Sequence, residues 1–205
     1  MHRQDLEGDV TRWTVDDHLV GLSVNVAHNV IVTCPLVHSI KEFSSRGDFL
    51  REFPLRDDVI NPSHAIQTRS GQFIVSHGDD RVHRVCTISA DGRHIVHSHD
   101  RRRGSLTGQY DWPYHLAVDD DEFVFVADLF NRRVTLLSPT LEYVRQVVSR
   151  DQLMGKPRRL YLDTQQRLLY VAVIEWKESG NLGRVAVFMF RKTFHCISVL
   201  LLYLS

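Results

Sequence analysis

The sequence predicts an all-β fold made of similar sheets, and three observations support this prediction. A proline that precedes a short apolar run recurs at Pro62, Pro113 and Pro157, at steps of roughly 40–50 residues, the length of one four-stranded blade. Apolar runs of strand length alternate with turns rich in Gly, Asn and Asp. No strongly amphipathic helix is visible in the sequence. We therefore expect a β-propeller that is incomplete, with about four four-stranded blades.

The repeated units are expected to form one propeller region at residues 21–190. The units lie near residues 21–55, 61–98, 112–149 and 156–190. Residues 1–20 form a lead-in that contains Val10–Val15, which would be the outer strand of a preceding blade. Residues 191–205 form an apolar tail of doubtful origin that does not resemble the repeats, and the alternative is a last strand of the fold.

Each unit is expected to begin with an inner strand and to continue with up to three more strands. The second strands are Val30–Val32, Phe73–Val75, Phe123–Val126 and Leu168–Val173. The third strands are Ile40–Ser44, Val82–Ser89, Val134–Ser138 and Val185–Phe190. The fourth strands are Phe49–Phe53, His94–His97 and Tyr143–Val148, and the last unit shows no recognisable fourth strand. Arg101–Gly108 is expected to be an inserted loop, and Arg150–Gly155 has room for one helical turn at most.

Bulk composition argues against several classes of protein. The formal net charge is zero, which is unusual for a general nucleic-acid binder. Cys34, Cys86 and Cys196 are far apart in the sequence, so neither a zinc finger nor a disulfide framework is indicated. The N-terminus has no apolar signal core, so we expect a cytoplasmic location. The apolar tail is shorter than the ~20 residues that span a bilayer, so no membrane partner is expected.

Three segments of the third unit resemble the NHL repeat. They are Pro113–Asp119, Phe125–Asp128 and Asn131–Val134, and the resemblance extends over roughly Leu22 to Phe190. NHL repeats build propellers, commonly six-bladed, in tripartite-motif proteins and others. The resemblance implies a fragment of a longer NHL protein, in which loops of one propeller face contact protein or RNA. Three scattered cysteines cannot supply the zinc ligands of a RING domain, so we expect no ubiquitin-ligase activity and no enzyme.

The candidate binding residues combine arginines with aromatic rings. The inserted loop and the residues that follow it contribute Arg101, Arg102, Arg103, Tyr110, Trp112 and Tyr114. The matching strand entry of the next unit contributes Arg158 and Arg159. The turn after Asp128 contributes Arg132 and Arg133. Tyr, Trp and Arg are common hot spots of protein interfaces, and the same residues suit stacking and phosphate contacts with single-stranded RNA. A protein partner is the leading interpretation, RNA is an alternative, and a solvated loop without a ligand is the third possibility. Asp128 and Asn131 are expected to bond backbone amides in their turn.

Histidines suggest a further alternative, a metal-dependent propeller of the lyase or lactonase type. His64 and His115 occupy equivalent positions on inner strands, but a catalytic zinc site usually takes three protein ligands. His97 and His99 share a strand face and are expected to be solvated. We therefore expect no metal and no cofactor. Finally, an open arc of blades leaves two terminal blade faces bare, so self-association through them is expected.

Overall fold

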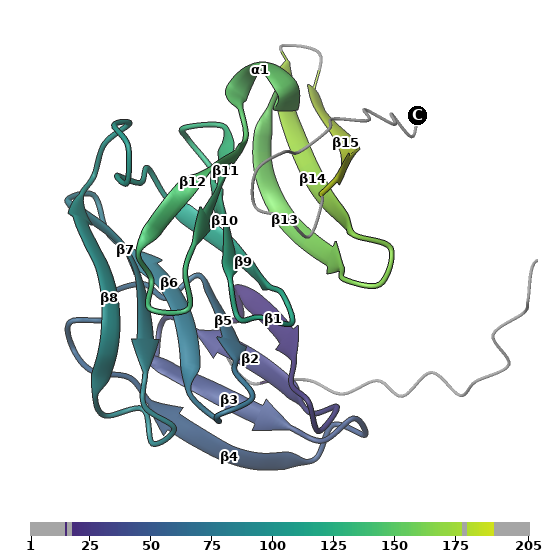
Figure 1. The fold of residues 1–205 in the computed structure, drawn as a ribbon. Coiled ribbons are helices and arrows are strands. Elements are labelled where there is room, and N and C mark those ends of the chain that lie inside the picture. The colour runs from purple at the N-terminus through teal and green to yellow at the C-terminus, as the bar shows by residue number, and fades with distance from the viewer. Residues whose placement is uncertain (1–14, 16–17, 178–179, 191–205) are drawn as a thin grey trace, which may run out of the picture.

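The computed structural model describes Val15, residues 18–177 and residues 180–190. Within these residues the chain is all-β and forms a β-propeller of four blades (Figure 1), which confirms the predicted fold class. The predicted tail at 191–205 and, except for Val15, the predicted outer strand Val10–Val15 lie outside the described residues.

Each blade is an antiparallel sheet whose strands pair in sequence order. The first blade holds β1 (Gly21–Val24), β2 (Val30–Cys34), β3 (Ser39–Phe43) and β4 (Phe49–Pro54). The second holds β5 (His64–Gln67), β6 (Phe73–Gly78), β7 (Val82–Ile88) and β8 (Ile95–Arg102). The third holds β9 (Pro113–Val118), β10 (Val124–Asp128), β11 (Arg133–Leu137) and β12 (Tyr143–Val148). After helix α1 (Arg150–Leu153), the fourth holds β13 (Lys156–Asp163), β14 (Leu168–Lys177) and β15 (Gly180–Met189).

The hairpin between the first and second strand of every blade is closed in the same way. A residue with a left-handed backbone lies in each turn, namely His28, Gly71, Glu122 and Arg167. The residue just before each turn makes a hydrogen bond from its side chain to the backbone of the turn. The side-chain oxygens of Asn25, Asp119 and Asp163 accept hydrogen bonds from backbone amides, and the Thr68 hydroxyl donates to Gln72 O. Short polar side chains favour such turns, which is why the turn positions were visible in the sequence.

The core lies in layers between neighbouring blades. Ile31 and Ile40 of the first blade meet Phe73 and Val75 of the second in one apolar cluster. Ile74, which points to the opposite face of β6, belongs instead to the cluster between the second and third blades. Adjacent residues of one strand thus enter different layers, as the alternation of side chains across a strand requires. Inner strands β1, β5, β9 and β13 lie next to one another in chain order around the axis (Figure 1).

The expected fourth strand of the second blade, His94–His97, differs from the observed β8, and the expected helical turn agrees. β8 continues to Arg102, because Arg101 and Arg102 pair through their backbones with His83 and Val82 of β7, so the expected loop at Arg101–Gly108 begins two residues later. The single helical turn expected in Arg150–Gly155 is present as α1. None of the described helices is long and apolar enough to cross a membrane.

Candidate binding site at the junction of the third and fourth blades

The equivalent histidines of the inner strands form a ladder along the axis. The rings of His64 and His115 stack with their centroids 3.8 Å apart. The backbone amide of Leu116 donates to His64 Nδ1 at 3.3 Å, and the amide of Leu160 donates to His115 Nδ1 at 3.3 Å. His64 Nε2 in turn donates to Leu22 O at 3.2 Å. Each Nδ1 lone pair therefore joins one blade to the next.

Burial decides the charge of this ladder. Desolvation lowers the pKa of His64 to about 4, although its bond to Leu22 O opposes the shift. Desolvation, the neighbouring His64 ring and Arg159 lower the pKa of His115 to about 2. Both rings are neutral at physiological pH and serve as hydrogen-bonding partners. Among the described residues, no group of three or more His, Cys, Asp or Glu side chains is arranged to hold a metal ion.

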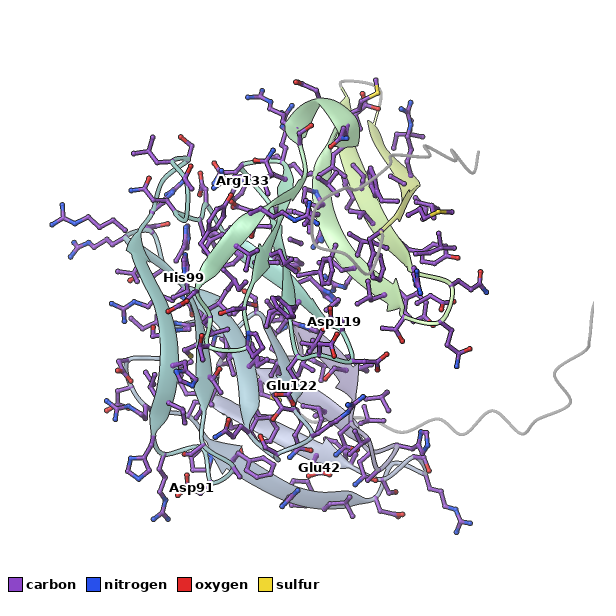
Figure 2. All side chains as sticks on the ribbon, viewed as in Figure 1. Glu42, Asp91, His99, Asp119, Glu122 and Arg133 are labelled. Atoms are coloured by element: carbon purple, nitrogen blue, oxygen red, sulfur yellow. The ribbon has the colours of Figure 1, made fainter. Side chains whose placement is uncertain are left out.

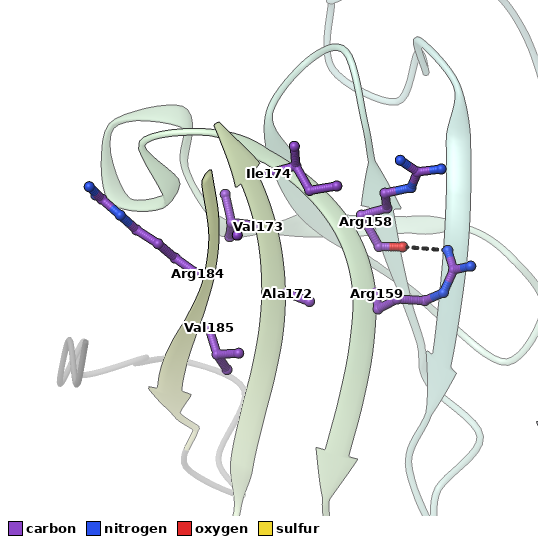
Figure 3. A pocket seen from close by; sticks show the side chains of 8 residues that line it. Arg158, Arg159, Ala172, Val173, Ile174, Arg184 and Val185 are labelled. Carbon is purple, nitrogen blue, oxygen red and sulfur yellow. Dashed lines mark hydrogen bonds between the residues drawn. The ribbon is translucent and has the colours of Figure 1, made fainter. Parts of the chain in front are cut away.

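Arg159 occupies the position of these histidines in the fourth blade. Its Nη1 donates to Arg158 O at 3.0 Å, drawn as a dashed line in Figure 3, and its Nη2 donates to Val20 O at 3.4 Å. The same guanidinium lies 5.2 Å from the centroid of the Tyr114 ring. Arg159 therefore links the fourth blade both to the third and, across the axis, to the residue that precedes β1.

Tyr110 and Arg133, two of the predicted binding residues, lie inside the molecule. Tyr110 is fully buried, with its hydroxyl 3.0 Å from Thr135 Oγ1. Arg133 (Figure 2) donates to Asp128 Oδ2 at 2.8 Å and to the carbonyl oxygens of residues 105, 106 and 109. These bonds hold the connection between β8 and β9 against the third blade. Both side chains are occupied by structural contacts and do not belong to the candidate site.

Asp128 is the buried anion of this arrangement. Its Oδ1 accepts from the amide of Asp111 at 2.8 Å, and its Oδ2 accepts from Asn131 Nδ2 at 2.8 Å as well as from Arg133. Burial raises the pKa of Asp128 to about 6, although these donors favour the carboxylate. Asp128 and Asn131 were expected to bond amides within their own turn. Instead they reach the preceding connection, where Asn131 Nδ2 also donates to Gly104 O at 2.8 Å.

His99 differs from its expected solvated position. It is buried, and its Nδ1 and Nε2 lie 3.0 Å from Leu141 O and 2.6 Å from Gly108 O (Figure 2). The imidazole therefore lies between the third blade and the connection that follows β8. His97, two residues earlier on β8, is half-buried.

Two of the three arginines near the end of β8 have described side chains. Arg102 is exposed, and the side chain of Arg101 lies outside the described part of the chain. Arg103 Nε donates to Asp111 Oδ1 at 2.9 Å, and its Nη1 donates to Asp80 O at 3.4 Å. Arg103 is thus paired with Asp111 of the connection itself, and neither Arg102 nor Arg103 lines the cleft between the third and fourth blades.

Trp112, Tyr114 and Arg158 do come together, in a cleft between the third and fourth blades. We call it the Tyr114 cleft; its volume is about 190 Å³. Its lining residues are Trp112, Tyr114, Leu129, Phe130, Lys156, Arg158 and Ile174. Four structural elements position them: the entry to β9, the turn between β10 and β11, strand β13 and strand β14.

Cations lie over aromatic rings at two places around the cleft. Lys156 Nζ lies 4.4 Å from the centroid of the Phe130 ring, which packs edge-on against Trp112 at 6.0 Å. The guanidinium of Arg158 lies 5.2 Å from the centroid of the Tyr114 ring, and its Nη2 donates to the Tyr114 hydroxyl at 3.2 Å. These cation–π contacts hold the cations at the rim of the cleft.

The electrostatics of the cleft are dominated by positive charge. Desolvation raises the pKa of Tyr114, but hydrogen bonds from Arg158 and Arg159 and their charges outweigh it, so the net shift is downward. The pKa of Lys156 is lowered by desolvation and by the nearby charge of Arg132. Arg132, one of the predicted binding residues, is half-exposed in its turn. It adds positive charge near the cleft but does not line it.

Sequence reasoning missed Leu129, Phe130, Lys156 and Ile174. Phe130 carried a usable signal, because an aromatic residue between Asp128 and Asn131 in a tight turn must lie near the surface, and it is 40% exposed. Lys156 immediately precedes a repeat proline but has no counterpart of the same type before Pro62 or Pro113. Leu129 and Ile174 carry no signal that distinguishes them from core residues.

The outward face of the fourth blade borders the cleft. A broad hollow of about 550 Å³ runs over Arg158, Arg159, Ala172, Val173, Ile174, Gly183, Arg184 and Val185 (Figure 3). In that view Arg184 points away from Arg158 and Arg159, so the three guanidinium groups do not converge. Tyr161 on β13 is 65% exposed and Leu22 on β1 is 56% exposed, so both terminal blades present apolar side chains to solvent.

Comparison with known proteins supports the fold and leaves the family open. No model of a known protein family matches the chain, and no curated protein matches it. Similar solved structures include virginiamycin B lyase from Staphylococcus aureus, with TM-score 0.53, 14% identity, and coverage of 87% of this chain and 58% of that chain. The structure of a nidogen/laminin complex gives TM-score 0.59, 18% identity, and coverage of 82% and 59%. A protein of unknown function from Bacteroides caccae gives TM-score 0.56, 10% identity, and coverage of 87% and 58%.

These structures correct one prediction. The chain spans less than two thirds of each of these proteins, and the likeness shows the propeller fold alone. Because virginiamycin B lyase is an enzyme built on a similar propeller, the prediction that this chain is not an enzyme is wrong as an inference from its architecture. The supported statement is a four-bladed propeller whose neighbours include both an enzyme and a propeller from a protein complex.

Proposed function

We propose that this chain is an NHL-type recognition propeller that binds a segment of a partner protein in the Tyr114 cleft. The observation that carries the proposal is the arrangement of three aromatic rings and two rim cations around one opening. Tyr, Trp and Arg are the residue types most enriched in interface hot spots. A protein in the solved nidogen/laminin complex has a similar propeller, which supports binding of a protein partner as a use of this architecture.

The size of the cleft favours a side chain over a free small molecule. Sites for drug-sized ligands have volumes of roughly 300–1,000 Å³. The Tyr114 cleft, at about 190 Å³, is smaller and suits a single anchoring side chain of a longer ligand. The remaining contacts of that ligand would then fall on the rim, where Arg158 and Arg159 are exposed.

RNA binding is the weaker alternative. Single-stranded RNA is held by bases that stack on free aromatic faces. Lys156 lies over the Phe130 ring, and Arg158 and Arg159 lie over the Tyr114 ring. A base would have to displace these cations from the ring faces, at the cost of contacts worth about 0.5–1 kcal/mol each at exposed sites.

Selection from a displayed library of random linear peptides tests the proposal. Peptides selected on the natural chain are expected to bind the Phe130→Ser variant at least about tenfold more weakly, because the anchor loses one wall of its cleft. Tyr161→Ser removes an even more exposed aromatic ring outside the cleft, 65% exposed against 40% for Phe130, and is the control. Peptides that bind both variants like the natural chain, failure to enrich any peptide, or binding confined to polyuridine would each overturn the proposal.

A further inference from the structure

We propose that Ser105 is a phosphorylation site for a serine kinase that selects arginine-rich segments. Ser105 lies in the connection between β8 and β9 and does not line the Tyr114 cleft, so the site is independent of the proposed function. Two observations support the proposal: one sequence pattern occurs twice in the chain, and the structure places its two copies in opposite surroundings.

The pattern consists of two arginines, one apolar or glycine residue, a residue with a hydroxyl group and a leucine. It occurs at residues 102–106, Arg-Arg-Gly-Ser-Leu, and at residues 132–136, Arg-Arg-Val-Thr-Leu. A kinase with carboxylates beside its active site pairs with such arginines, because a guanidinium group forms bidentate hydrogen bonds with a carboxylate. An apolar pocket after the acceptor position takes the leucine. Both segments therefore offer the same recognition chemistry.

The second copy is inaccessible in the folded chain. Thr135 is fully buried on β11, and its hydroxyl lies 3.0 Å from that of Tyr110. Phosphoryl transfer requires the acceptor oxygen to lie in line with the transferred phosphate. A kinase cannot reach this hydroxyl while the third blade is folded.

The first copy lies at the surface. Ser105 is exposed, and its hydroxyl makes no hydrogen bond to the residues that the structure describes. Leu106 is 69% exposed, so its side chain is available to an apolar pocket of the kinase. Arg102 is exposed, and Arg103 is exposed although it pairs with Asp111 at 2.9 Å. Since exposed ion pairs are weak, a kinase carboxylate can replace Asp111.

The contacts that hold this segment leave its acceptor side chain exposed. The carbonyl oxygens of Ser105 and Leu106 accept hydrogen bonds from Arg133 at 3.1 and 3.3 Å. A kinase that binds the segment in an extended form also breaks the 2.9 Å hydrogen bond from Gly104 N to Tyr110 O. Connections open locally at a lower free energy than the blades unfold. The folded chain is therefore expected to be a slower substrate than a free peptide of the same sequence.

The transfer step balances with ATP as the phosphoryl donor. Ser105 Oγ attacks the γ-phosphorus of ATP, which the kinase holds together with Mg²⁺. The new Oγ–P bond forms as the bond between this phosphorus and the β–γ bridging oxygen breaks, and ADP leaves. The serine proton passes to the catalytic carboxylate of the kinase. The connection gains a charge of about −1.5 to −2 at neutral pH.

Phosphorylation by the catalytic subunit of cyclic-AMP-dependent protein kinase, with radiolabelled ATP and Mg²⁺, tests the assignment. The variant Thr135→Ser gives both copies the same acceptor, and synthetic peptides of residues 101–108 and of residues 131–138 with this substitution establish that the kinase accepts both patterns. In the folded variant, mass spectrometry of a protease digest should locate phosphate on Ser105 and not on residue 135. Ser105→Ala should remove the label, whereas Thr107→Ala, which removes another exposed hydroxyl of the connection, should retain it.

Arginine variants show whether recognition follows the pattern. Arg102→Gln and Arg103→Gln should each lower kcat/KM for Ser105 about tenfold or more, because each removes a charge-assisted hydrogen bond to the kinase. Arg132→Gln changes the matching position of the buried copy and should leave this rate unchanged.

Three results would overturn the assignment. The first is phosphorylation of Ser105 in the free peptide but not in the folded chain. The second is labelling of residue 135 in the folded variant at a rate similar to that of Ser105, because the surroundings of the two copies would then not decide the site. The third is a rate at Ser105 that neither Arg102→Gln nor Arg103→Gln changes.

Discussion

Replacing Arg133 by leucine removes the cation that holds the connection between β8 and β9 against the third blade. The substitution breaks the 2.8 Å pair with Asp128 and three hydrogen bonds to backbone carbonyl oxygens. Asp128 is fully buried, so its carboxylate would remain without its cationic partner. Arg132, in the same turn but half-exposed, provides the matched control as Arg132→Leu.

The expected cost is large. Removing one partner of a buried ion pair typically destabilises a protein by about 3–5 kcal/mol, because the remaining charge is left uncompensated. A typical domain has a total stability of about 5–15 kcal/mol, so Arg133→Leu should shift the unfolding midpoint clearly. Arg132→Leu should change the free energy of unfolding by no more than about 0.5 kcal/mol. The double variant Asp128→Asn with Arg133→Leu should be more stable than Arg133→Leu alone, since it no longer buries an unpaired carboxylate.

Urea unfolding followed by tryptophan fluorescence measures these differences. Limited trypsin cleavage gives an independent readout, because Arg103 lies at the start of the released connection and is 43% exposed. Cleavage after Arg103 under native conditions should be faster in Arg133→Leu than in Arg132→Leu. If the two variants have free energies of unfolding within about 1 kcal/mol and equal cleavage rates, the buried pair does not have the role assigned to it.

Two further predictions concern the axis and the close contact between the first two blades. Between about pH 6.5 and 4 an unfolded histidine binds a proton while His64, with its pKa of about 4, does not, so the contribution of His64 to the free energy of unfolding should fall by about 3 kcal/mol, and His115, with its pKa of about 2, adds a loss of the same sign. In denaturant titrations at several pH values, the free energy of unfolding should depend less on pH in the double variant His64→Asn with His115→Asn than in the natural chain. The control His28→Asn, which changes an exposed ring, should leave this pH dependence as in the natural chain. Gly21→Ala would place a Cβ 2.5 Å from Ser63 O, and overpacking of this kind costs about 1–3 kcal/mol. Gly183→Ala, where a Cβ meets nothing within 4 Å, should leave the melting temperature unchanged, and equal melting of the two alanine variants would contradict the contact.

Most strands could be predicted from the sequence, but the contacts between residues far apart along the chain could not. Apolar runs and short polar turn residues are local signals, and they located most strands within one or two residues. β8 was predicted too short, because Arg101 and Arg102 look like loop residues and join the sheet only through backbone bonds to β7. Pairing with a partner strand some twenty residues away leaves no mark on composition.

In the candidate site, too, residue types could be recognised from the sequence, but long-range contacts could not. Trp112, Tyr114 and Arg158 were recognised by residue type, and the structure places them around one cleft. Tyr110 and Arg133 have the same residue types, but their burial depends on contacts with residues 24 to 28 positions away along the chain. An arginine that binds a ligand and one that supports a loop cannot be distinguished until the partners of each guanidinium are known.

The histidine ladder joins neighbouring blades through a group that does not depend on residue type. Each ring bonds a main-chain amide of the following blade, and any residue except proline supplies such a group. At this joint, a blade that carries the histidine therefore depends on the backbone of its successor and not on one of its side chains. The joint itself therefore tolerates any residue except proline at the amide position, while the apolar layers between blades still constrain the side chains packed within them.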